Sequence, residues 1–269
     1  ALPISSFTLQ YIRDSWLMAM AEMDSEQRAT WEAIYDKKNE EFLKNPSVGK
    51  DLLRWKYQRY VKEYCRTIRS VDEQVGRLLD YLEEKGVLDN TVIVYTSDQG
   101  FLLGEHGLYD KRFMYEESFR TPLIISCPSL VKKHSVCKEL VQNIDLAPTF
   151  LSLAGVEVPK EMSGRSLLPL FKNGKAENWR NELYYHFYDY PAVGSVRKHD
   201  GIRTKRYKLI HWHGEGSGND EAIDFWELYD LKKDVMEVNN VYDNPKYVKV
   251  REALTVQLEK LRKDVGVTE

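Results

Sequence analysis

The residues best suited to chemistry follow one apolar run, residues 92–95. Asp98 and Gln99 come just after it and offer a carboxylate and an amide oxygen, which are ligands that Ca²⁺ or Mg²⁺ prefers. Lys111 follows a glycine-bracketed turn and suits an anionic group held beside such a cation. The pattern predicts a strand that delivers these groups to its C-terminal edge, where open α/β sheets keep their ligands.

The elements around this segment alternate between helix and strand. Apolar residues at spacings of three and four predict a long amphipathic helix over about 51–85, and Gly86 stops it. Strands are predicted at 92–96 and, as a second buried strand, at 123–126. A further helix is expected from Asp145, which suits the N-cap position, to Leu153. This alternation is typical of an α/β sheet.

The character of the chain changes near residue 180. Three short aromatic and β-branched segments, 183–188, 201–212 and 225–231, predict a small antiparallel sheet, and 246–263 has the period of a helix. Residues 1–45 also look helical. We therefore predict an α/β fold in which part of a mixed β-sheet is flanked by helices, plus a small C-terminal antiparallel sheet packed by a terminal helix. The predicted domains are 1–180 and 181–269.

Charge and hydropathy exclude two classes of partner. The 269 residues carry 39 basic and 42 acidic side chains, for a net charge of −3, so no electrostatic footprint for nucleic acid is expected. No run of 18 or more apolar residues occurs, so we expect no membrane span.

A series of short motifs in a fixed order resembles the C-terminal half of the metal-dependent sulfatases of the alkaline phosphatase superfamily. The motifs occupy residues 71–79, 97–100, 104–107, 119–125, 145–149, 163–167 and 227–231. The resemblance implies that Asp98 is a Ca²⁺ ligand, with Mg²⁺ as the alternative ion. It makes Gln99 the next ligand, where the family usually has Asn or His, and it makes Lys111 the group that binds sulfate near the leaving oxygen.

Residues 184–188, 196–199 and 201–204 resemble the branch that contains N-acetylglucosamine-6-sulfatases and mucin-desulfating enzymes. The resemblance implies a sulfated carbohydrate substrate, with 6-O-sulfated N-acetylglucosamine as the expected unit. His186, Arg197 and His199 are the candidate sugar contacts, with side-chain packing as the alternative for the two histidines. The resemblance also suggests a secreted, periplasmic or lysosomal location, which the sequence leaves unknown.

Half of the family's active site has no counterpart in the sequence. The family's nucleophile is a formylglycine made from a (Cys or Ser)-x-(Pro or Ala)-x-Arg motif, and the nearest match, 65–69, has Thr67 at its third position and lies within a predicted helix. The family's adjacent aspartate pair is also missing. We expect that an N-terminal half of the same enzyme supplies these groups and that this chain alone is inactive. The alternatives are a non-catalytic carbohydrate-binding module and another metal hydrolase of the superfamily.

His211 and His213 are a further candidate pair. Their spacing of two places both on one face of a strand, which could suit a metal ion. The sequence shows no third ligand, so a packing role is favoured.

Overall fold

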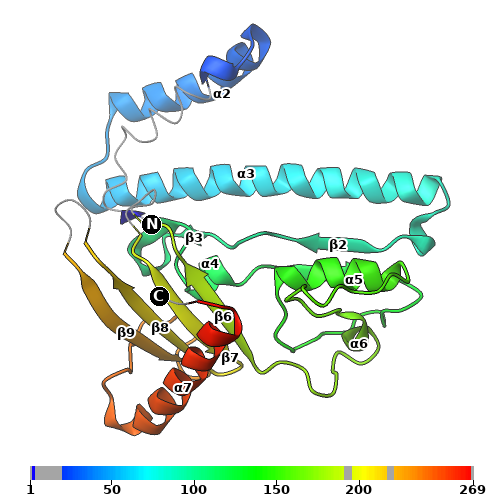
Figure 1. Cartoon of the computed structure of the whole chain (residues 1–269). Coiled ribbons are helices and arrows are strands. Elements are labelled where there is room, and N and C mark those ends of the chain that lie inside the picture. Colours follow the sequence, from blue (N-terminus) through cyan, green and yellow to red (C-terminus); the bar gives the residue numbers. More distant parts are fainter. Residues whose placement is uncertain (1, 4–19, 191–195, 217–220, 268–269) are drawn as a thin grey trace. The chain divides into compact units, whose positions relative to one another are not determined.

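The computed structural model describes residues 2–3, 20–190, 196–216 and 221–267 (Figure 1). Contacts divide the chain into two compact units, one of residues 85–101 and 110–269 and the other of 2–84 and 102–109. The domain boundary near residue 180 stays a prediction.

The unit with the long helix contains α2 (Ser25–Lys44) and α3 (Gly49–Glu84). Asp24 caps α2 by accepting from the main-chain N–H of Gln27 at 2.8 Å. The predicted helix over 51–85 is confirmed as α3. β1 (Leu2–Pro3), β3 (Leu102–Leu103) and β4 (Leu108–Asp110) form a small sheet in the order β1–β4–β3. The predicted helical character of 1–45 falls partly on residues 4–19, which lie outside the described residues.

The strand that precedes Asp98 is paired with the second predicted strand. β2 (Ile93–Thr96) and β5 (Leu123–Ser126) are antiparallel, and Thr96 lies opposite Leu123. Successive side chains of a strand point to opposite faces. Leu123 and Ile125 therefore pack under the helices α5 (Leu146–Leu153) and α6 (Leu168–Phe171), whereas Ile124 is 63% exposed. The prediction that this strand is buried is thus wrong for one of its faces.

The C-terminal sheet is a four-stranded antiparallel meander. Its strands are β6 (Glu182–Phe187), β7 (His199–Thr204), β8 (Tyr207–Gly214) and β9 (Ile223–Asp230), in that spatial order. The predicted single segment over 201–212 is two strands joined by a tight turn. The Thr204 hydroxyl oxygen makes this turn by accepting from the N–H of Tyr207 at 2.9 Å.

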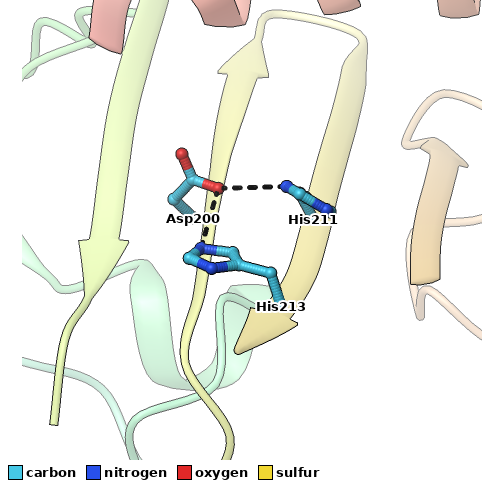
Figure 2. A group of neighbouring side chains, drawn as sticks. All are labelled: Asp200, His211 and His213. Carbon is cyan, nitrogen blue, oxygen red and sulfur yellow. Dashed lines mark ion pairs between the residues drawn. The ribbon is translucent and has the colours of Figure 1, made fainter. Parts of the chain in front are cut away.

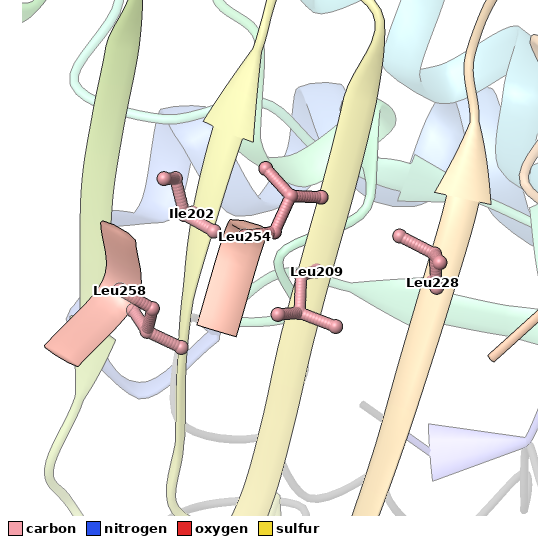
Figure 3. Close-up of a cluster of buried hydrophobic side chains, with 5 residues drawn as sticks. All are labelled: Ile202, Leu209, Leu228, Leu254 and Leu258. Atoms are coloured by element: carbon pink, nitrogen blue, oxygen red, sulfur yellow. The ribbon is translucent and has the colours of Figure 1, made fainter. Parts of the chain in front are cut away.

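The last helix, α7 (Val248–Asp264), covers one face of this sheet (Figure 1). Leu254 and Leu258 lie one turn apart and pack on the inward side chains of Ile202, Leu209 and Leu228, as Figure 3 shows. Burying a leucine fully contributes about 1.5–3 kcal/mol, so this cluster fixes the helix on the sheet. The predicted terminal helix and antiparallel sheet are confirmed.

Short elements complete the described chain. They are the helix α4 (Glu116–Phe119) and the 3₁₀ turns η2 (Leu88–Asn90), η3 (Glu105–Gly107), η4 (Asn143–Asp145) and η5 (Pro245–Tyr247). Among the described residues, no helix combines the length and apolar character that crossing a membrane requires.

Candidate functional site

The loop after β2 carries Asp98 and Gln99, and hydrogen bonds from two side chains hold its backbone. The Ser97 hydroxyl donates to the Gln99 carbonyl oxygen at 2.7 Å. The Asn143 side-chain amide donates to the carbonyl oxygens of Ser97 and Asp98, both at 3.0 Å. Asp98 itself is exposed and Gln99 is half-buried. The loop conformation is thus fixed by main-chain contacts while the Asp98 carboxylate faces solvent.

Asn143 lies in the 3₁₀ turn η4, whose last residue, Asp145, forms a buried ion pair. The Asp145 carboxylate is fully buried and accepts two hydrogen bonds from the Arg180 guanidinium, at 2.5 and 2.7 Å. It also accepts from the N–H groups of Gln142 and Arg165, both at 2.8 Å. The predicted helix from Asp145 to Leu153 is confirmed as α5, with Asp145 at its N-cap position. The Asp145 side chain makes no cap bond to α5, because its oxygens serve these partners.

The loop that carries Lys111 has a constrained backbone. Asp110 and Arg112 have φ values of 84° and 90°, a region that residues other than glycine rarely adopt, and their side chains form an ion pair. The Tyr185 hydroxyl donates to the Arg112 carbonyl oxygen at 2.8 Å. Lys111 between them is half-buried. Sequence reasoning missed Asp110, although its spacing of two from Arg112, with Lys111 between them, was a usable signal.

One cavity joins the metal-side loop to the C-terminal sheet. It has a volume of about 870 Å³, and its lining includes Asp98, Gln99, Arg112, Tyr185 and Arg203. Burial raises the pKa of Tyr185 to about 12, so its hydroxyl remains a proton donor at neutral pH. Such a cavity, with convergent polar groups and apolar walls, is the usual form of a small-molecule site.

Four of the predicted site residues do not line this cavity: Lys111, His186, Arg197 and His199. His186 lies on β6, where its Nδ1 is 3.1 Å from the Tyr184 hydroxyl and its ring stacks on Tyr188 with 3.7 Å between centroids. The Arg197 guanidinium lies over the Tyr190 ring at 4.7 Å. These four residues lie outside the cavity lining that includes Asp98, and their roles stay predictions.

His199 is fully buried within aromatic side chains. Its ring stacks on Trp212 with 4.2 Å between centroids, and its Nδ1 is 2.9 Å from the Arg197 carbonyl oxygen. Burial lowers the pKa of His199 to about 4, so the imidazole is neutral at physiological pH. A neutral imidazole can donate its Nδ1–H to that carbonyl and hold the Arg197 backbone in place.

Figure 2 shows a second polar group, on β7 and β8, in which Asp200, His211 and His213 point toward one another. One ligand atom from each lies within 4.8 Å of the others, a spacing near that of a metal site. Asp200 lies opposite His211 in the strand register, so it is the third group that the sequence did not reveal. Burial lowers the pKa of His213.

Arg262 of α7 already provides the cation for this cluster. Its Nε and Nη2 donate to the two oxygens of Asp200, each at 2.5 Å. The same Nη2 is 2.9 Å from His211 Nδ1, which must accept because a guanidinium only donates. His211 Nε2 then carries the proton and donates to Asp224 at 2.8 Å. The lone pair of His211 Nδ1, which a metal ion would need, thus accepts a hydrogen bond from Arg262.

Two protein families match the chain. The family described as "Sulfatase" matches residues 21–156, and the family described as "N-sulphoglucosamine sulphohydrolase, C-terminal" matches residues 104–264. The chain belongs to the sulfatase family. This confirms the resemblance drawn from the short motifs, and it confirms the mixed α/β fold class, since the structural neighbours are sulfatases too.

Individual relatives agree with this assignment. This sulfatase chain is 49% identical over 243 residues to an N-acetylglucosamine-6-O-sulfatase of Bacteroides thetaiotaomicron, covering 90% of the chain and 42% of the relative. It is 40% identical over 124 residues to the human N-acetylglucosamine-6-sulfatase, covering 45% of the chain and 22% of that protein. The solved structure of BT4656 in complex with its substrate D-glucosamine-2-N,6-O-disulfate has a TM-score of 0.84 and 48% identity, covering 91% of this chain and 48% of that one. The chain thus spans less than half the length of these relatives.

Membership of the sulfatase family implies a metal ion. Among the described residues, the Asp98–Gln99 loop and the Asp200–His211–His213 cluster both have suitable donor atoms. The oxygen donors of the first suit a hard cation, and the exposed Asp98 carboxylate borders the cavity. The imidazole donors of the second suit softer metals, and Arg262 holds its carboxylate.

Proposed function

We propose that the chain is part of a sulfatase that hydrolyses sulfate esters of carbohydrates, with 6-O-sulfated N-acetylglucosamine as the expected unit. The observation that carries the proposal is the 49% identity to an N-acetylglucosamine-6-O-sulfatase over 90% of the chain. The cavity beside Asp98 and Gln99 supports it, because it offers oxygen ligands and a concave surface in one place.

In this proposal Asp98 and Gln99 hold a Ca²⁺ ion, for which Mg²⁺ is the alternative. The carboxylate supplies charge and the amide supplies a neutral oxygen, and both are ligands that hard cations accept. When bound, the ion would stabilise negative charge on the sulfuryl oxygens. The chain's own contribution is to keep the two ligands in place, through the Asn143 bonds to the carbonyl oxygens of Ser97 and Asp98.

Lys111 is the proposed sulfate-binding group near the leaving oxygen. Its ammonium is a compact positive charge that suits an anionic ester next to a cation. The neighbouring backbone is fixed by the Asp110–Arg112 ion pair and by the Tyr185 bond to Arg112, so the lysine starts from a defined position. Preorganised charge of this kind costs no reorganisation when the ester reacts.

His186, Arg197 and His199 are the proposed sugar-side residues. The side chains of Arg197 and His186 are partly exposed. His199 is buried, and we assign it the supporting role of holding the Arg197 carbonyl oxygen. His186→Ala and Arg197→Ala are expected to weaken sugar binding without changing metal binding.

The nucleophile is proposed to be a formylglycine in an N-terminal half of the same enzyme, which would be the partner of this chain. Cys65, the start of the nearest motif match, lies within α3 and is exposed on a continuous helix. The proposed metal ligands Asp98 and Gln99 belong to a different segment of the sequence from Cys65. The chain alone is accordingly expected to release no sulfate from a sulfated sugar.

The proposal is tested by calorimetric titration of the purified chain with Ca²⁺ and then with N-acetylglucosamine 6-sulfate. Asp98→Ala removes the only charged ligand of the proposed pair. Asp89→Ala is the matched control, because Asp89 is an exposed aspartate in η2, just before the same strand.

We expect weak Ca²⁺ binding and Ca²⁺-dependent sugar binding in the parent chain and in Asp89→Ala, and neither in Asp98→Ala. Sugar binding that does not depend on Ca²⁺ and survives Asp98→Ala would contradict the proposal. It would favour a carbohydrate-binding module instead.

A further inference from the structure

Two loops carry the proposed ligands, and one serine bonds to both. The main-chain N–H of Gly100, next to Gln99, donates to the Ser118 carbonyl oxygen at 2.8 Å. The main-chain N–H of Arg112, next to Lys111, donates to the Ser118 hydroxyl oxygen at 3.0 Å. Ser118 is 6% exposed and lies in α4. Its backbone therefore holds the metal-side loop and its side chain holds the anion-side loop.

The metal-side contact is made backbone against backbone. A Cβ atom added at Gly100 would lie 2.0 Å from the Glu117 carbonyl oxygen and 3.2 Å from the Ser118 carbonyl carbon. Real Cβ atoms do not approach so closely, so only glycine lets the loop reach α4. The final glycine of the Ser-Asp-Gln-Gly run thus serves the approach to Ser118.

The anion-side contact holds a strained backbone. Arg112 has φ 90°, and a residue other than glycine in such a conformation costs about 1–3 kcal/mol and persists only where its surroundings fix it. Its N–H is bonded by Ser118 and its carbonyl oxygen by the Tyr185 hydroxyl. The peptide units on both sides of Arg112 are therefore fixed, and Lys111 is attached to one of them.

α4 needs external support because a helix of four residues is not stable alone. The support is a buried ionic cluster around Lys208, whose Nζ lies 2.6 Å from the Met114 carbonyl oxygen, 3.0 Å from Glu116 Oε1 and 2.6 Å from Glu237 Oε1. Glu237 Oε2 accepts from the Glu116 N–H at 2.7 Å. Arg203 adds a second cation at 3.3 Å from Glu116.

The two carboxylates of this cluster, Glu116 and Glu237, both have pKa values shifted from the ordinary value. Burial alone would raise the pKa of Glu116, but Lys208 and Arg203 beside it bring the pKa below its ordinary value. Burial raises the pKa of Glu237 despite the same lysine. The contacts of Glu116 with Arg203, Lys208 and Glu237 anchor the start of α4 to β7, to β8 and to the segment after β9.

We propose that Ser118 is a positioning residue that sets the spacing between the metal-side residues Asp98 and Gln99 and the anion-side residue Lys111. The inference rests on the proposed function, because it assumes that these residues act on one sulfate ester. In this scheme the Ser118 hydroxyl acts through the Arg112 backbone.

The test compares Ser118→Ala with Ser118→Thr, which keeps a hydroxyl. Ser152→Ala is the control for loss of a serine hydroxyl elsewhere: Ser152 is a half-buried serine of α5 whose hydroxyl donates to the Pro148 carbonyl oxygen at 2.8 Å. The first readout is amide hydrogen exchange of the full chain, resolved at Gly100 and Arg112 by NMR. The second is the affinity for Ca²⁺ and, at saturating Ca²⁺, for N-acetylglucosamine 6-sulfate.

In Ser118→Ala the Arg112 amide is expected to exchange about tenfold faster, since a hydrogen bond contributes up to roughly that factor. Gly100, which bonds to the remaining carbonyl oxygen, is expected to be unchanged. Sugar affinity is expected to fall about tenfold with Ca²⁺ affinity within about twofold of the parent chain. Ser118→Thr is expected to restore both values, and Ser152→Ala to leave them unchanged.

Unchanged Arg112 exchange in Ser118→Ala would overturn the proposal. So would an equal loss of Ca²⁺ and sugar affinity, which would indicate a general structural defect. If the parent chain binds neither Ca²⁺ nor the sugar, the proposed function fails, and the exchange at Arg112 and Gly100 alone then decides whether Ser118 positions the loop.

Discussion

Lowering the pH from 8 to 5 is expected to destabilise the fold through His199. The side chain is fully buried, and burial lowers its pKa to about 4 from the ordinary value of 6.5. In the unfolded chain the same imidazole is in water and titrates near its ordinary value. Between these two pKa values the unfolded state binds more protons than the folded state, so stability falls as the pH falls.

The two pKa values set the size of the effect. With 6.5 in the unfolded chain and about 4 in the folded chain, His199 lowers the free energy of unfolding by about 2 kcal/mol at pH 5 and about 3 kcal/mol at pH 4, relative to pH 8. At pH 8 the group is almost entirely neutral in both states and contributes almost nothing. His213 acts in the same direction because burial lowers its pKa as well.

The assay is urea denaturation at pH 8 and pH 5, for the parent chain and for His199→Asn. The quantity compared is the loss of stability between the two pH values, so a constant packing defect in the variant cancels. His134→Asn is the matched control, since His134 is exposed. We expect the variant to lose about 2 kcal/mol less than the parent chain and the control to match the parent. Equal losses in the parent chain and His199→Asn would refute the reasoning.

Three further changes test the packing that positions the site. Asp145→Asn breaks the buried pair with Arg180 and is expected to lower the free energy of unfolding by about 3 kcal/mol, and denaturation with an unchanged midpoint would contradict this. Gly100→Ala places a Cβ 2.0 Å from a carbonyl oxygen, so faster amide exchange over residues 97–118 is expected, and unchanged exchange would exclude the close approach. Leu258→Ala is expected to cost about 2–5 kcal/mol in thermal or urea unfolding, whereas Val256→Ala, at a 71% exposed position of the same helix, should cost little.

Local patterns in the sequence predict the elements well. The helix over 51–85 and the strand over 123–126 follow from hydrophobic period and from flanking glycine and proline residues, and the structure has α3 and β5 at these places. The hairpin between β7 and β8 escaped prediction because its turn is made by the Thr204 side chain and not by a Gly or Asn pair. Its Lys205–Arg206 step looks like ordinary strand surface.

Most features that the sequence did not predict depend on contacts between residues that are distant in the sequence. Asp145 looks like a helix cap until Arg180, 35 residues later, lies against it. Lys208 reads as a surface lysine, but the fold brings two carboxylates to it and buries it fully. The Asp200 that joins His211 is placed by strand register, which periodicity alone does not give. The residues Asp98 and Gln99 were found because their motif is local, although their roles stay proposals.

The most direct test of the proposed site is a crystal structure of the chain with Ca²⁺ and N-acetylglucosamine 6-sulfate, in which anomalous scattering locates the cation. We expect the cation at the Asp98 and Gln99 oxygens and the sulfate group within reach of the Lys111 ammonium. A cation at Asp200, His211 and His213 with Arg262 displaced, or a sulfate group remote from Lys111, would contradict the proposed site.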